Sequence, residues 1–230
     1  SHILEEGIAD IIMIGDEEKI RDGAGWLEVE LDGVTVVNPQ TTDKLDKYVE
    51  LLYETRKAKG MTMEKARETL LNDYLTFGVM MVKANDADGM VAGACHATAD
   101  TLRPALQILK TAPGVKLVSG FFILDVPDCK YGANGTFLFA DCGLNQDPNA
   151  EELAAIAESS AKSFQSLVGA KPIIAMLSHS TKGSAKHPLV DKVVEATKIA
   201  KEQYPYLCID GELQTDAALV PSVAKSKAPG

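Results

Sequence analysis

The chain has 230 residues, 46% apolar and 24% charged, which is the composition of a folded globular protein rather than a disordered one. Its 23 Lys and Arg against 33 Asp and Glu leave a net charge of −10, and because no basic cluster stands out, we expect no nucleic-acid partner. No apolar run approaches the roughly 20 residues that cross a bilayer, so we expect no membrane contact. The four cysteines form no C-x-x-C pair and no signal peptide is seen, which indicates no disulfide framework and a reducing cytoplasm.

Short apolar segments recur along the chain, and most of them are continuous rather than alternating. Continuous segments are typical of strands buried on both faces, as in parallel sheets covered by helices. They predict strands at residues 9–14, 34–37, 79–82, 89–92, 116–124, 136–140, 173–177 and 207–209. The expected fold class is therefore α/β.

Apolar residues at helical spacing predict helices at residues 43–59, 63–71, 102–110, 150–168 and 189–203. The helix at 150–168 has the clearest limits, because Asn149 and Glu152 form a capping-box pattern and Gly169 follows the last turn. The turn at 111–114 follows one helix and precedes a long apolar strand. It predicts a boundary between two domains, residues 1–114 and 115–230.

Both ends of the chain resemble interrupted elements. Residues 1–7 resemble the last turns of an amphipathic helix that ends at Gly7, and residues 226–230 form a turn with nothing after it. We expect a chain truncated at both ends, whose incomplete sheets expose apolar edges and lower its solubility.

The segment from residue 86 to residue 104 is a first candidate for ligand binding, because it passes from an expected strand into a helix. Asp100 or Thr101 can cap that helix, which places Arg103 in its first turn, where a cation opposes the helix dipole. Such an arginine suggests a shared anion such as phosphate. An ion pair with a nearby carboxylate accounts for Arg103 equally well.

A second candidate is the loop from Ser178 to Lys186, which follows the expected strand at 173–177. Its hydroxyls, glycine and two lysines could cradle an oxyanion, although the spacing is not that of a P-loop. A polar loop that caps the next helix explains the same residues equally well.

Other polar residues have structural interpretations. Arg56 belongs to a basic last helical turn that suits the helix dipole, and Cys129 lies in a turn where packing is its expected role. His96, His179 and His187 share no metal-ligand spacing with one another or with the cysteines, so no metal site is expected. If extended, adjacent Cys95 and His96 would point to opposite sides.

Seven segments together resemble the phosphate acetyl/butyryl transferase family over essentially the whole chain: residues 59–66, 74–83, 88–94, 100–104, 178–186, 210–217 and 226–230. The resemblance implies reversible acetyl transfer between acetyl phosphate and coenzyme A (CoA), by direct thiolate attack in a ternary complex. It also implies a two-domain α/β/α fold of the isocitrate-dehydrogenase type, with mostly parallel sheets, an interdomain cleft and commonly a homodimer. CoA is then a substrate, and no cofactor is required.

The resemblance assigns roles to the candidate residues. Arg56 and Arg103 match family arginines that bind the phosphate end of the substrates, and Cys129 matches a cysteine near the active site. A family motif that lines the cleft corresponds to the loop with Ser178, Ser180, Thr181, Lys182 and Gly183.

The resemblance also implies residues that the chain lacks. The family's general base, a further arginine and a Ser-Arg pair would follow Gly230, so we expect the chain alone to be nearly inactive. Two alternatives stay open: a phosphate butyryltransferase, and a noncatalytic domain that senses CoA esters or mediates dimerisation.

Overall fold

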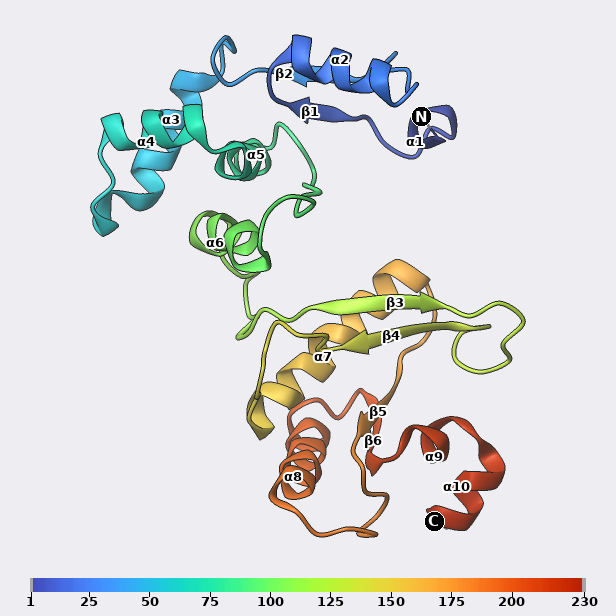
Figure 1. Ribbon diagram of the computed structural model, residues 1–230. Coiled ribbons are helices and arrows are strands. Elements are labelled where there is room, and N and C mark those ends of the chain that lie inside the picture. Colours follow the sequence, from blue (N-terminus) through green and yellow to red (C-terminus); the bar gives the residue numbers. More distant parts are fainter. Residues whose placement is uncertain (1, 229–230) are drawn as a thin grey trace. The chain divides into compact units, whose positions relative to one another are not determined.

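The computed structural model describes residues 2–228, which form two compact units, one ending at Lys110 and the other beginning at Thr111. Figure 1 labels the helices and strands of both units. Each unit combines helices with small sheets, which confirms the α/β class. Among the described residues, no helix is both long and apolar enough to cross a membrane.

In the first unit, strands β1 (Ile12–Ile14) and β2 (Thr35–Val37) pair in parallel. The other elements are α1 (His2–Glu5), α2 (Glu17–Trp26), α3 (Leu45–Arg56), the 3-10 turn η1 (Lys57–Lys59), α4 (Met63–Asn72), α5 (Tyr74–Lys83) and α6 (Thr98–Ile108). Helices α3 to α6 share one buried core, which includes Tyr48, Leu52, Leu70, Phe77 and Ile108.

Caps determine where the helices of this core begin and end. Thr62 accepts a hydrogen bond from the Lys65 N–H at the start of α4, and Asp73 accepts one from the Leu75 N–H at the start of α5. Gly60, with φ +84°, ends η1 in the left-handed conformation that glycine adopts most easily. The chain therefore turns sharply on both sides of α4, and α3, α4 and α5 can pack together.

In the second unit, β3 (Phe121–Asp125) and β4 (Thr136–Ala140) form an antiparallel hairpin, whereas β5 (Ile173–Leu177) and β6 (Cys208–Leu213) pair in parallel. The helices are α7 (Ala150–Val168), α8 (Pro188–Gln203), α9 (Thr215–Leu219) and α10 (Pro221–Lys227). Helix α8 connects β5 to β6 and packs against α7. The core here is built mainly of small side chains, with Ala154, Ala157, Ala196, Ala200, Met176 and Ile209 buried.

Two predicted strands are wrong. Residues 79–82 belong to α5, because a helix that is apolar on almost every side has the same sequence pattern as a buried strand. Residues 89–92 lie in the connection between α5 and α6 and form no strand. The other six predicted strands overlap β1 to β6, and the five predicted helices are present, α7 with the predicted limits.

The structure also differs from the sequence-based expectation in pairing and in number of helices. The β3–β4 pair is antiparallel, although the continuous apolar segments indicated parallel strands. Helices α2, α5, α9 and α10 are additional to those predicted. At the C-terminal end, Ser226 and Lys227 belong to α10 rather than to a turn, and residues 229 and 230 lie outside the described residues. At the other end, α1 is followed by Gly7 at φ +64°, as expected for a helix C-terminus, and residue 1 is outside the described part.

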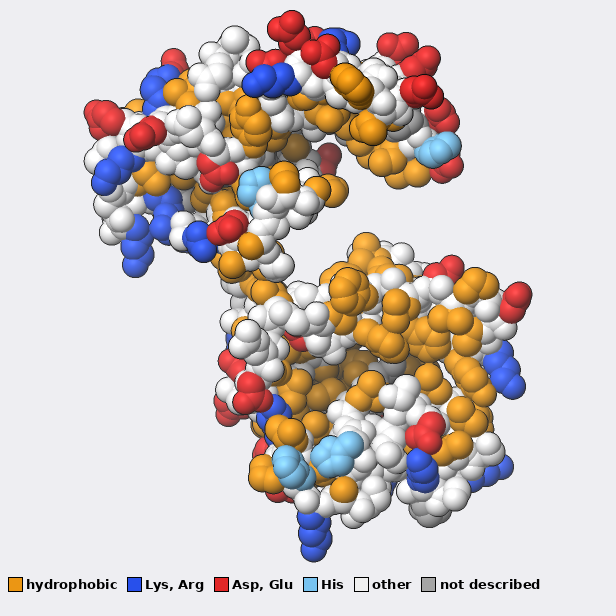
Figure 2. Space-filling view, in the orientation of Figure 1, with side chains coloured by type: hydrophobic (Ala, Val, Ile, Leu, Met, Phe, Trp, Pro, Cys, Tyr) orange, Lys and Arg blue, Asp and Glu red, His pale blue; other side chains and the backbone are white. Residues whose placement is uncertain are grey.

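Large apolar side chains are exposed in the second unit. Phe122 of β3 is 60% exposed and Ile173 of β5 is 80% exposed. Figure 2 shows apolar side chains over much of the visible face of this unit. This agrees with the expectation of exposed apolar residues on the sheets, and the low solubility inferred from it stays a prediction.

Asp86 connects the end of α5 to α3 in the first unit. Its carboxylate accepts hydrogen bonds from the Tyr48 hydroxyl (2.7 Å) and from the ammonium groups of Lys44 and Lys47 (both 3.0 Å). These donors, with the tyrosine first, hold the pKa of Asp86 far below its usual value. Burial and the neighbouring carboxylate raise the pKa of Tyr48. The carboxylate therefore stays ionised and the phenol stays protonated at neutral pH.

Asp86→Asn is expected to lower the free energy of unfolding of the first unit by about 1 to 2 kcal/mol at neutral pH. Because the folded-state pKa of Asp86 is depressed, its stabilising effect is complete above the unfolded pKa of about 4 and is lost as the pH falls below it. Denaturant titrations at neutral pH and near pH 3 should therefore show the difference between wild type and variant shrinking in acid. Asp46→Asn is the control, because the ion pair of Asp46 with Arg67 is largely exposed. An equal loss at both pH values would contradict the prediction.

Candidate functional site

Both arginines singled out in the sequence line the same cavity of the first unit. The cavity has a volume of about 330 Å³ and includes Arg56 from α3 and Arg103 from α6. Its apolar lining consists of Leu52, Met61, Leu75, Pro104 and Ile108, of which Leu52 and Ile108 belong to the shared core. Its polar lining consists of Thr69, Asp73, Thr76, His96, Asp100 and Gln107. The fold therefore brings two arginines from segments far apart in the sequence to the same cavity.

The helix ends explain how these arginines reach the cavity. Arg56 is the last residue of α3 and is half-buried, with the chain turning away after it through η1 and Gly60. Arg103 lies in the middle of α6, because that helix begins at Thr98 with Ala97 as its N-cap. The expectation that Arg103 lies in a first turn capped by Asp100 or Thr101 is therefore wrong, and the helix-dipole argument for an anion does not apply. The shared cavity gives a different reason to consider one.

The charges around the cavity leave both guanidinium groups able to bind an anion. Arg103 pairs with Asp100 at 3.3 Å, but both side chains are more than half exposed, and such pairs contribute little stability. Within residues 2–228, Arg56 has no carboxylate within 4.0 Å. The carboxylate of Asp73 already accepts hydrogen bonds from the Leu75 N–H and the Thr76 hydroxyl. Guanidinium donors match the geometry of phosphate oxygens, so this arrangement suits a phosphate group.

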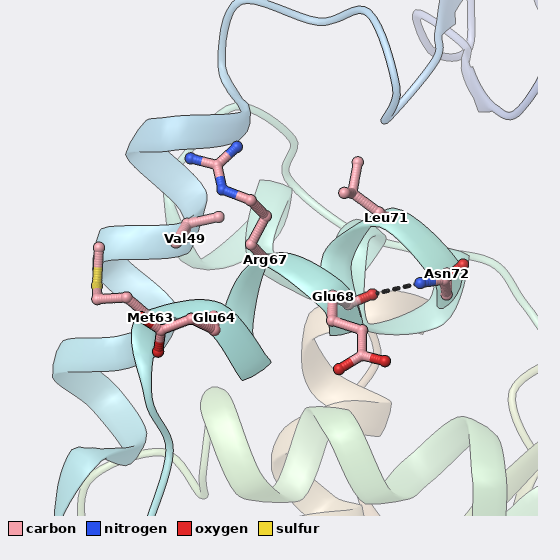
Figure 3. Close-up of a pocket in the computed structure, with 7 residues that line it drawn as sticks. All are labelled: Val49, Met63, Glu64, Arg67, Glu68, Leu71 and Asn72. Atoms are coloured by element: carbon pink, nitrogen blue, oxygen red, sulfur yellow. Dashed lines mark hydrogen bonds between the residues drawn. The ribbon is translucent and has the colours of Figure 1, made fainter.

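A neighbouring cavity between α3 and α4 has a different charge pattern. Its volume is about 450 Å³, and Figure 3 shows its lining residues Val49, Met63, Glu64, Arg67, Glu68, Leu71 and Asn72. It contains one arginine, Arg67, which is paired with Asp46, and two glutamates. Although this cavity is larger, its carboxylates disfavour an anion, and Arg67 serves below as a matched control.

The loop after β5 is held to β6 by a buried polar network. Ser180 and Thr181 are fully or almost fully buried, and the Glu212 side chain on β6 is buried as well. Glu212 accepts hydrogen bonds from the Ser180 hydroxyl (2.9 Å) and from the Gly183 N–H (2.7 Å). Burial alone would raise the pKa of Glu212, but these hydrogen bonds lower it below the usual value. Glu212 therefore acts as a buried, ionised anchor for the loop.

The remaining residues of the loop are also connected to β6. The Lys182 ammonium binds the Asp210 carboxylate (2.8 Å) and the Gly211 carbonyl (2.9 Å). Burial would raise the pKa of Asp210, but hydrogen bonds from Lys182 and Lys201 lower it to about 2. The Ser178 hydroxyl accepts a hydrogen bond from the Ser180 N–H. Ser178, Ser180, Thr181, Lys182 and Gly183 thus form one structured loop, whose substrate-binding role stays a prediction.

Cys129 lies on another loop of the second unit, in the connection between β3 and β4, and is half-buried. Within the described part of the chain, no group of three or more His, Cys, Asp and Glu side chains could hold a metal ion.

Sequence reasoning considered His96 only as a metal ligand and did not anticipate its place in the cavity with Arg56 and Arg103. Its position in the segment before Arg103 was the available signal.

Comparison with known proteins places the chain among acyltransferases. The family model "Phosphate acetyl/butaryl transferase" matches residues 1–230. The chain belongs to this family. A phosphate acetyltransferase of Acetivibrio thermocellus is 59% identical over 230 residues, which are 100% of this chain and 68% of that protein. One of Bacillus subtilis is 47% identical over 218 residues, 95% of this chain and 65% of the relative.

Solved structures of the family have the same fold as this chain. A phosphotransacetylase from Streptococcus pyogenes superimposes with a TM-score of 0.86 at 46% identity, covering 99% of this chain and 67% of that one. EutD phosphotransacetylase from Staphylococcus aureus gives a TM-score of 0.83 at 44% identity, covering 95% and 65%. The chain therefore spans about two thirds of the length of these relatives.

Proposed function

We propose that this member of the family transfers an acetyl group reversibly between acetyl phosphate and CoA. The observation that carries the proposal is the cavity shared by Arg56 and Arg103, in a chain 59% identical to a phosphate acetyltransferase. Acetyl phosphate and CoA both carry phosphate groups, which two guanidinium groups can bind with paired hydrogen bonds at any working pH.

The chemistry assigned to these residues is electrostatic. The CoA thiol loses its proton and attacks the acetyl carbonyl, the carbonyl carbon–oxygen bond to phosphate breaks, and phosphate leaves with the bonding electrons. Arg56 and Arg103 would orient the phosphate and stabilise the charge that develops on it. Direct transfer needs no covalent intermediate on the protein. We propose that the loop from Ser178 to Gly183 lies beside the bound substrates, and that Cys129 does so as well. The base that accepts the thiol proton is proposed to be a residue beyond Gly230.

The test is thioester formation from acetyl phosphate and CoA by the 230-residue chain, with CoA binding measured by calorimetry on the same sample. Butyryl phosphate is assayed in parallel, because one methylene changes discrimination by only about 1 to 3 kcal/mol. CoA binding without turnover would support both the assignment and the expected position of the base, whereas turnover would place the base within the chain. A folded chain that binds neither CoA nor acetyl phosphate would contradict the proposal.

We further propose a cytoplasmic homodimer. All four cysteines are free, which fits a reducing compartment. The exposed apolar side chains of the second unit could be buried in a subunit interface. Sedimentation equilibrium of the chain tests the dimer, and a monomer at all concentrations would contradict it.

A further inference from the structure

A cysteine and a histidine form a contact pair in the connection between α5 and α6. The Cys95 sulfur lies 3.6 Å from Nδ1 of His96, within the hydrogen-bonding range of sulfur, and Cys95 is exposed. The expectation that the two side chains point to opposite sides is therefore wrong, because this connection is not an extended strand. A thiol beside an imidazole has a proton acceptor at hand when the imidazole is neutral.

We propose that Cys95 is a site of thiol–disulfide exchange with small anionic disulfides, and that His96 accepts its proton. In this step the Cys95 thiol transfers its proton to Nδ1 of His96, and the thiolate attacks one sulfur of the disulfide RSSR. A new bond forms between Cys95 Sγ and one sulfur, the original sulfur–sulfur bond breaks, and RS⁻ leaves with its electron pair. The disulfide RSSR is the oxidant: Cys95 is oxidised to a mixed disulfide and one RS group is reduced to RS⁻, so atoms and electrons balance.

The surroundings of His96 explain the preference for an anionic reagent. His96 lines the cavity that contains Arg56 and Arg103, next to the carboxylates of Asp73 and Asp100. Asp100 is paired with Arg103, and the N-terminus of α5, which Asp73 caps, offsets part of the charge of Asp73, so Arg56 is the arginine of this cavity that has no carboxylate within 4.0 Å among residues 2–228. A negatively charged group on the disulfide can therefore approach this edge of the cavity favourably. An adduct on Cys95 would be attached next to His96, which lines the cavity of the two arginines, and any effect of the adduct on substrate binding rests on the proposed function.

The chain contains its own controls. Cys142 and Cys208 are exposed like Cys95, but the Cys142 thiol donates to the Phe139 carbonyl (2.9 Å), and within the described residues neither sulfur contacts an imidazole. Cys129 is half-buried. If exposure alone determined reactivity, Cys95, Cys142 and Cys208 would react at similar rates.

The experiment measures the rate at which each cysteine of the 230-residue chain reacts with dithiobis(nitrobenzoate), a disulfide with a carboxylate on each ring. Quenched samples are digested, and each cysteine is quantified by mass spectrometry. Cys95 is expected to react at least about tenfold faster than Cys208, a fraction of the roughly 10²- to 10⁴-fold effect of a positioned base in an enzyme. The ratio should fall with the neutral hydroxyethyl disulfide, and also with added salt.

Two variants separate the imidazole from its surroundings. His96→Gln should reduce the Cys95 rate to that of Cys208, whereas His179→Gln, whose ring packs against His187, should leave it unchanged. Circular dichroism and denaturant titration report whether each variant is folded, because Cys142 and Cys208 are exposed and lie in the second unit. Equal rates at Cys95 and Cys208 in the wild type, or an unchanged Cys95 rate in His96→Gln, would overturn the proposal. Neither result depends on acetyl transfer, so a failure here is distinct from a failure of the proposed function.

Discussion

Arg56→Ala should weaken the binding of CoA and acetyl phosphate to the 230-residue chain by about 10- to 100-fold. A hydrogen bond to a charged group contributes about 1.5 to 3 kcal/mol, and each 1.4 kcal/mol corresponds to about a tenfold change in affinity. Arg56 has the larger expected effect of the two arginines, because it lies half-buried in the cavity and within residues 2–228 forms no ion pair that its removal would disrupt. Calorimetric titration of each substrate measures the change directly.

Arg103→Ala should also weaken binding, but less, because its guanidinium is more exposed and divides its charge between the substrate and Asp100. Arg67→Ala is the matched control, since Arg67 belongs to the neighbouring cavity and already pairs with Asp46. If all three variants lost affinity equally, the effect would reflect net charge rather than a site. If Arg56→Lys retained full affinity, the paired geometry of the guanidinium would not be needed.

The sequence predicts local features of this fold well, where a local signal exists. Helix α7 has the predicted limits because Asn149, Glu152 and Gly169 form a complete set of end signals, and the structure contains both hydrogen bonds of the capping box. Helix α5 was not predicted from the sequence, because it is apolar on nearly every side, with Leu75, Phe77 and Val79 among its buried residues. Periodicity cannot distinguish that pattern from a buried strand, although Asp73 was the available cap.

The candidate site shows why spatial relations are harder to predict than elements. Nothing local indicates that Arg56 and Arg103 share a cavity, because this depends on how α3 and α6 pack on a common core. The family resemblance suggested both arginines by position alone. Nor could the sequence show that Ser180 and Gly183 donate to Glu212, since that contact requires the parallel pairing of β5 with β6.

The Glu212 network leads to the second large effect that we expect. Glu212→Ala should lower the free energy of unfolding of the second unit by about 2 to 4 kcal/mol, because it leaves the Gly183 N–H without its acceptor and the buried Ser180 hydroxyl with only longer contacts, to Ser184 Oγ (3.4 Å) and the Ala185 carbonyl (3.5 Å). Glu195→Ala on α8 is the control, since its pair with Lys198 is exposed, and it should change stability by no more than about 0.5 kcal/mol. Denaturant titration of the three proteins measures these differences.

The same network predicts a local change that stability alone would not reveal. The Gly183 amide should be protected from hydrogen exchange in the wild type and should exchange rapidly in Glu212→Ala, whereas Glu212→Gln, which keeps an acceptor oxygen, should restore part of the protection. Because the folded-state pKa of Glu212 is lowered, its stabilising effect is present above the unfolded pKa of about 4.3 and is lost as the pH falls below it. Protection of Gly183 should therefore decline in acid in the wild type and stay low throughout in Glu212→Ala. Rapid exchange of Gly183 in the wild type at neutral pH would show that Glu212 does not hold the loop, and the five candidate residues from Ser178 to Gly183 would then lack the fixed geometry that substrate binding requires.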